Sequence, residues 1–295
     1  MPKRTDLALE SGSLSEPCRG ITVDERRQKG IKITRIKIID GEGERAIGKP
    51  MGNYITVEAD SLDGQLDDSC REIISGELET LLPKQGTVLV AGLGNLDITP
   101  DALGPKTASQ VLATRHIDRQ TAEKMGISHL RPVCVLSPGV LGKTGIETAE
   151  IILGAVERIK PSAVVAVDAL AAGDLSRLGK TVQISDAGIC PGSGVGNSRK
   201  EISRRLLGVD VIAVGVPTVV DAETLAEDYF EKLGREYGTN GCPAGTDRKF
   251  SAAPKMMVTP REIDSVIDHA ADLVALSINC ALQKHLSPEE ICALI

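Results

Sequence analysis

The chain has 295 residues and a formal net charge of −7 at pH 7. This charge is the opposite of what binding to nucleic-acid phosphates requires. With two phenylalanines, three tyrosines and no tryptophan, the chain also has almost no aromatic side chains on which single-stranded bases can stack. The length allows one large domain or two small ones. Because no convincing linker divides the sequence, we expect a single domain over residues 1–295.

The seven cysteines are scattered along the chain, and no C-x-x-C pair occurs. This pattern is typical of a reducing compartment. No signal peptide precedes the first charged residues, and no apolar run reaches about 18 residues. We therefore expect a cytoplasmic protein without membrane contact.

The first 60 residues divide into two parts. Residues 1–29 have a polar and irregular pattern, apart from RTDLALES, which could form a short helix. Within residues 30–60, IKITRIKIID and NYITVEAD alternate apolar with polar residues, and a turn-rich stretch separates them. The alternation predicts antiparallel strands with one solvated face, an accessory β layer beside the main core.

After an expected amphipathic helix over residues 66–83, the pattern changes to short apolar strands separated by helices. Strands are expected at TVLVAGL, RPVCVLSP, AVVAVDAL, TVQISDAG and VDVIAVGVP, and helices at TASQVLATRHI, TGIETAEIILGAVERI and SRKEISRRLLG. The alternation predicts a three-layer α/β fold, with helices on both faces of a mostly parallel, twisted sheet. A loop over residues 235–255 precedes a long last helix, which we expect Thr259 to cap.

Two of the expected strands lead into aspartates, Asp101 and Asp168. In open α/β sheets, ligands bind in the crevice at the carboxyl ends of the strands. Each aspartate also has a structural explanation: Asp101 suits the start of a helix capped by Thr99, and Asp168 can cap a loop. If the two carboxyls meet, they share a proton, so that one can activate water and the other can act as an acid toward an amide.

Other residues near these strand ends are further candidates. The same two aspartates with a third ligand could hold a divalent metal, although the four histidines show no paired spacing. Two glycine-rich turns let the backbone approach a substrate closely. The second has the spacing G-x-G-x-G, which matches no nucleotide-binding fingerprint. The candidates for substrate binding are Gly94, Asn95, Gly192, Ser193 and Gly194, and those for assisting catalysis are Asp97, Asp186 and Asp221.

Seven segments in order resemble the germination protease family of endospore-forming bacteria. They are RTDLALE (4–10), GLGNLDITPDALGP (92–105), SPGVLGKTGIET (137–148), VDALAA (167–172), DAGICPGSGVGNSRKE (186–201), VGVPTVVDA (214–222) and MMVTPREID (256–264). The resemblance implies an atypical aspartic-type endopeptidase that degrades small acid-soluble spore proteins at germination. It also implies that the enzyme does not itself bind DNA. The family's essential aspartates match Asp101 and Asp168.

The resemblance carries three further implications. The fold is expected to be similar to that of hydrogenase-maturation peptidases, which bind nickel at the corresponding places and so keep the metal alternative open. Family members are homotetramers. They are made as zymogens whose propeptide is removed just before the RTDLALE stretch. Because three residues precede Arg4 here, we expect at most a vestigial propeptide within residues 1–29.

Overall fold

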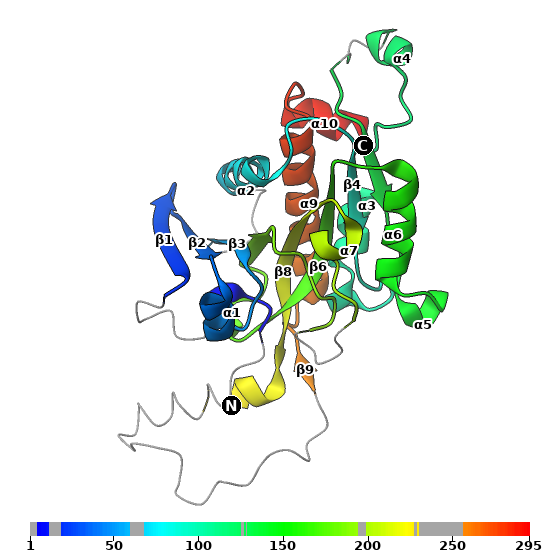
Figure 1. Cartoon of the computed structure of the whole chain (residues 1–295). Coiled ribbons are helices and arrows are strands. Elements are labelled where there is room, and N and C mark those ends of the chain that lie inside the picture. Colours follow the sequence, from blue (N-terminus) through cyan, green and yellow to red (C-terminus); the bar gives the residue numbers. More distant parts are fainter. Residues whose placement is uncertain are drawn as a thin grey trace, which may run out of the picture.

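The computed structural model describes residues 5–11, 19–59, 68–124, 127, 129–193, 199–226, 229 and 256–295. Within these residues one sheet has the strand order β1-β2-β3-β7-β8-β6-β4-β5, and β9 pairs with β8. Figure 1 shows this sheet running through the molecule, with α6 on one side and α9 behind it. The predicted α/β class is confirmed.

One half of the sheet is parallel. It consists of β5 (Val133–Leu136), β4 (Val88–Gly92), β6 (Ala163–Ala172) and β8 (Asp210–Asp221). These strands are continuous apolar runs because helices cover both of their faces. β7 (Thr181–Ser185) pairs antiparallel with β8, and from there the sheet continues antiparallel.

The antiparallel strands expected from residues 30–60 are β2 (Ile31–Ile38) and β3 (Gly52–Glu58). They extend the central sheet, because β3 pairs with β7. The expectation of irregular structure before residue 30 was wrong, since β1 (Ile21–Gln28) pairs along the whole of β2. Nearly all of β1 is exposed, so its sequence has no apolar alternation that could identify a strand.

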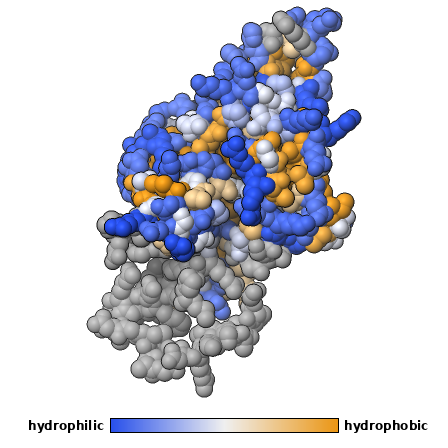
Figure 2. All heavy atoms as spheres, viewed as in Figure 1, coloured by the Kyte–Doolittle hydropathy of each residue, from blue (hydrophilic) through white to orange (hydrophobic). Residues whose placement is uncertain are grey.

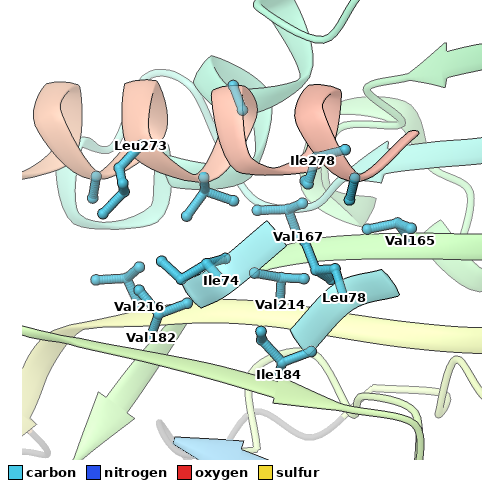
Figure 3. Close-up of a cluster of buried hydrophobic side chains, with 14 of the residues drawn as sticks. Ile74, Leu78, Val165, Val167, Val182, Ile184, Val214, Val216, Leu273 and Ile278 are labelled. Atoms are coloured by element: carbon cyan, nitrogen blue, oxygen red, sulfur yellow. The ribbon is translucent and has the colours of Figure 1, made fainter. Parts of the chain in front are cut away.

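Three helices pack on one face of the sheet: α2 (Asp68–Leu81), α3 (Leu103–Ser109) and α9 (Ile263–Leu282). Figure 3 shows the resulting core, in which Leu273 and Ile278 of α9 face Val165 and Val167 of β6 and Val214 of β8. The helix α6 (Thr148–Ile159) packs on the opposite face with the short helix α7 (Arg204–Leu207). Aliphatic side chains form both cores.

The last long helix begins later than expected. α9 starts at Ile263, and the Thr259 hydroxyl donates to the Thr218 carbonyl at 2.9 Å instead of capping the helix. By length and composition α9 could cross a membrane, but 67% of its most apolar window is buried inside the molecule. That burial is typical of a core helix.

The remaining described elements are short. They are α1 (Gly41–Ile47), α4 (Arg119–Lys124), α5 (Leu141–Thr144), α10 (Pro288–Leu294), the 3-10 helices η1 (Ala8–Glu10), η2 (Thr99–Asp101) and η3 (Leu175–Arg177), and β9 (Met257–Val258). Of the predicted helix SRKEISRRLLG, only α7 forms. The loop expected over residues 235–255 lies outside the described residues.

Candidate active site

Asp168 lies inside β6, which continues to Ala172. The expectation that the strand ends at this aspartate was therefore wrong. The neighbouring strand β4 does end here, since its last residue, Gly92, pairs with Val167. From Asp168 onward, β4 therefore no longer pairs with β6, while β8 still pairs on the other side. Asp168 is only 5% exposed, and its Oδ1 accepts the N–H of Ala169 at 3.0 Å.

Asp101 reaches the same region from η2, in the connection between β4 and α3. Its Oδ2 accepts the backbone N–H of Asn95 at 2.8 Å, and its carbonyl oxygen lies 3.1 Å from the same nitrogen. Thr99 lies inside η2 and does not cap it. The chain is therefore folded back so that Asn95 holds the Asp101 carboxyl in place.

Gly94 makes this fold-back possible. Its φ of +113° is rare for residues with a side chain, and a Cβ atom here would lie 2.1 Å from the Asp101 carbonyl oxygen. The predicted glycine-rich turn thus allows the backbone to pass close to Asp101. Its Asn95 contributes a backbone N–H to the candidate site.

The two carboxyl groups interact electrostatically. The pKa of Asp168 is raised well above its usual range, first by burial and then by the negative charges of Asp101 and Asp6. Burial also raises the pKa of Asp101, while the hydrogen bond from Asn95 opposes this shift by stabilising the carboxylate. The charge of Asp101 thus acts on Asp168, the other aspartate that the sequence singled out.

A third carboxylate in this group, Asp6, was not predicted as a site residue. Its Oδ2 accepts the N–H of Ala171 at 2.9 Å, and its own N–H donates to the Ala171 carbonyl at 2.9 Å. The Ser193 hydroxyl donates to Oδ1 at 2.6 Å. The Gln183 side chain further holds the segment, through the Asp6 carbonyl at 3.1 Å and the Ala8 N–H at 2.7 Å.

The rest of the segment Thr5–Ser11 is fixed equally firmly. Leu7 and Ala8 are fully buried. Glu10 accepts hydrogen bonds from Arg177 at 2.9 Å and from the Gly173 N–H at 2.6 Å. In sequence, Asp6 and Glu10 look like the polar face of a short helix. Only the resemblance of RTDLALE to the family drew attention to this stretch.

A partly buried cation, Lys49, contacts the same N-terminal segment. Its Nζ donates to the Thr5 carbonyl at 3.0 Å. The pKa of Lys49 is lowered by burial, and the charges of Asp6 and Glu10 counteract that shift. In the described part of the chain, no group of three or more His, Cys, Asp or Glu side chains is placed to hold a metal ion.

The three aspartates considered as assistants make other contacts. Asp97 is exposed and forms an ion pair with Lys143. Asp186 accepts hydrogen bonds from the backbone and the side chain of Asn53, tying β7 to β3. Asp221 accepts the Glu223 N–H at 2.9 Å, as a helix cap does.

The second glycine-rich turn is only partly described. Gly192 has a φ of +74°, and Ser193 contacts Asp6 as stated above. Gly194 lies outside the described residues. Among the described residues of this turn, Ser193 is thus the candidate that contacts one of the three carboxyl groups, that of Asp6.

Comparisons with known proteins agree on one family. The sequence profile described as "Germination protease" matches residues 5–247. The germination protease of Caldanaerobacter subterraneus is 44% identical, over 99% of this chain and 98% of its own length. That of Clostridium perfringens is 41% identical, over 98% and 97%, and that of Priestia megaterium 36% identical, over 98% and 96%.

A solved structure was also found. It is a [NiFe] hydrogenase maturation protease, HycI, from Thermococcus kodakarensis. It is 17% identical, with a TM-score of 0.37 over 68% of this chain and 98% of its own.

Proposed function

The chain belongs to the germination protease family, and from this premise we propose that it is an endopeptidase that begins the degradation of small acid-soluble spore proteins at germination. We place it in the spore cytoplasm as a homotetramer, without direct contact with DNA or membrane. The observation that carries the catalytic part of this proposal is the electrostatic coupling of Asp101 and Asp168 where β6 extends beyond β4.

The environments of the two aspartates suggest different roles. Asp168 is the more deeply buried, and its raised pKa favours the protonated form, which can donate to a carbonyl oxygen. Asp101 receives the Asn95 N–H, which favours its carboxylate. We therefore assign Asp101 as the base and Asp168 as the acid.

In this mechanism Asp101 takes a proton from water while the water oxygen bonds to the peptide carbonyl carbon. Asp168 gives its proton to the carbonyl oxygen, so that the tetrahedral intermediate is neutral. When the intermediate collapses, the C–N bond breaks, Asp101 gives its proton to the leaving amine, and Asp168 recovers its own. Proton transfer of this kind contributes roughly 10²- to 10⁴-fold in rate.

The zymogen character expected from the family also belongs to this proposal. Asp6 is hydrogen-bonded to Ala171 on the strand that carries Asp168, and its charge acts on Asp168, so the segment Thr5–Ser11 lies close to a carboxyl group that we assign to catalysis. This placement supports self-processing near the N-terminus. The expected cleavage point, just before Arg4, lies outside the described residues.

The competing function is a metal-dependent peptidase that uses the same aspartates as ligands. To decide between them, a purified small acid-soluble spore protein is incubated with the enzyme before and after exhaustive chelation. We expect the same discrete fragments at an unchanged rate in both. Loss of cleavage on chelation, with rescue by one added metal, would reject the two-aspartate mechanism.

A further inference from the structure

The strand β8 contains one residue more than its neighbour β6 over their shared length. Leu170 of β6 pairs with Pro217, but the next residue, Ala171, pairs with Val219, so Thr218 has no partner in β6. This arrangement is a β-bulge. A bulge bends its strand and changes the direction of a side chain, and bulges are frequent beside active sites.

The packing of β8 shows that the bulge reverses the faces of the strand. Val216 lies in the core beneath α9 (Figure 3), together with Val167 of β6. Val220, four residues later, packs instead with Leu170, which points to the opposite face of β6 from Val167. In a regular strand, residues four apart point to the same face. The extra residue, Thr218, accounts for the change.

The Thr218 side chain holds the loop that carries Asp101. Thr218 is only 1% exposed, and its hydroxyl donates to the Pro100 carbonyl at 2.8 Å. Pro100 directly precedes Asp101, whose N–H donates to the Ile98 carbonyl at 2.8 Å. The peptide group between Pro100 and Asp101 is therefore held at both its oxygen and its nitrogen.

The bulge is itself held in place by other parts of the chain. Thr259, which directly follows β9, donates its hydroxyl to the Thr218 carbonyl at 2.9 Å. The Gly179 N–H donates to the Pro217 carbonyl at 2.9 Å. Hydrogen bonds thus lead from Thr259 through Thr218 to the backbone of Asp101. Such support matters because a displacement of about 1 Å at a reacting group can lower the rate about 100-fold.

We propose that Thr218 is a positioning residue for catalysis, which fixes the Asp101 carboxyl through its hydrogen bond to the Pro100 carbonyl. This proposal rests on the proposed endopeptidase function. Thr218 acts through Asp101 and takes no part in proton transfer. A hydroxyl that served stability alone would change the free energy of unfolding and leave kcat as it is.

The test compares Thr218→Val, which removes the hydroxyl and keeps the shape of the side chain, with Thr218→Ser, which keeps the hydroxyl. Thr34→Val is the matched control, because Thr34 is fully buried and its hydroxyl has no hydrogen-bond partner among the described residues. The substrate is a purified small acid-soluble spore protein, at a temperature well below unfolding. In Thr218→Val we expect kcat to fall at least about 10-fold, whereas Thr218→Ser and Thr34→Val stay within about threefold of the wild type.

KM should stay within about twofold in all three variants, because substrate contacts at the surface are retained. Figure 2 shows hydrophilic and hydrophobic residues side by side on one face of the molecule. Neither Thr218 nor Thr34 contributes appreciably to the molecular surface, since both are buried. A fall in kcat at constant KM therefore reports on the reacting groups.

Hydrogen exchange tests the same contact without cleavage. In the peptide spanning residues 93–102, we expect the Asn95 and Asp101 amides to exchange at least about 10-fold faster in Thr218→Val, and at the wild-type rate in Thr218→Ser and Thr34→Val. If the wild type cleaves nothing, the proposed function fails, and exchange alone decides whether Thr218 holds the Asp101 loop. Unchanged exchange in Thr218→Val, an unchanged kcat in that variant, or an equal loss in Thr218→Ser would overturn the positioning role.

Discussion

At the scale of single residues, Asp168 combines burial with nearby negative charge. Its carboxyl lies in the apolar strand β6 and faces the charges of Asp101 and Asp6. Its pKa in the folded state is therefore higher than the value of about 4 in the unfolded chain. The stability that this group contributes is present in full below pH 4 and is lost as the pH rises through the folded-state pKa.

Replacing the carboxyl by a neutral group of the same shape should remove this cost. We expect Asp168→Asn to lose about 10²- to 10⁴-fold in kcat/KM yet to unfold at a higher temperature than the wild type at pH 8. The difference should shrink toward pH 4, since each unit by which the pKa is raised corresponds to about 1.4 kcal/mol. Thermal unfolding at several pH values measures this, with the exposed Asp97→Asn as control. A variant that is less stable than the wild type at pH 8 would contradict the assigned burial cost.

Gly94 gives a second prediction at this scale. In Gly94→Ala the new methyl group would overlap the Asp101 carbonyl oxygen. The turn must therefore move, and we expect activity to fall by more than about 10-fold because the reacting groups are displaced. Gly76→Ala in α2 is the control: its Cβ meets nothing within 4 Å, so stability should rise by about 0.5–1 kcal/mol without loss of activity. Wild-type activity in Gly94→Ala would show that the turn does not position Asp101.

The sequence identified Asp101 and Asp168 but not Asp6, for a physical reason. Asp101 and Asp168 follow apolar runs whose strand character is local. Asp6 joins them through contacts with Ala171, Gln183 and Ser193, all more than 160 residues away in the chain. Contacts between residues so far apart in the chain cannot be predicted from the local sequence pattern around Asp6.

At the scale of elements, one buried glutamate joins the antiparallel edge of the sheet to a helix. Glu77 of α2 is 3% exposed and accepts hydrogen bonds from Arg26 of β1 at 2.7 Å and from the Arg35 Nε of β2 at 3.1 Å. β1 has few buried side chains of its own. This ion-pair group ties β1 and β2 to α2.

We expect Glu77→Gln to lower the free energy of unfolding by about 1–3 kcal/mol, because two arginines lose their charged acceptor. Glu79→Gln on the same helix is the control: it breaks the largely exposed pair with Lys284 and should change stability by less than about 1 kcal/mol. Denaturant unfolding of both variants compares them directly. Equal losses would mean that Glu77 is no more important than a surface charge.

Elements were predictable where burial left a pattern. The continuous apolar strands β4, β6 and β8 were predicted, because helices on both faces demand apolar residues at every position. β1 and the antiparallel pairing of β7 were missed, because exposed edges and strand direction leave no such pattern. The predicted cap of the last helix failed because the Thr259 hydroxyl binds Thr218 instead.

At the scale of the whole molecule, the sheet brings four distant parts of the chain to one place. The N-terminal segment, the β4–η2 connection, β6 and the turn at Ser193 all meet near the end of β4. The N-terminal segment adds a third carboxylate to this group. The fold thereby concentrates negative charge in a buried region, where carboxyl pKa values rise.

The central claim is that Asp101 and Asp168 act as one catalytic unit. It is tested most directly by kcat/KM for cleavage of a purified small acid-soluble spore protein by the wild type, Asp101→Asn, Asp168→Asn and the double variant. We expect each single variant to lose about 10²- to 10⁴-fold, and the double variant to lose little more, because groups that act together are not additive. A single variant that retains wild-type kcat/KM, or losses that multiply in the double variant, would contradict the account.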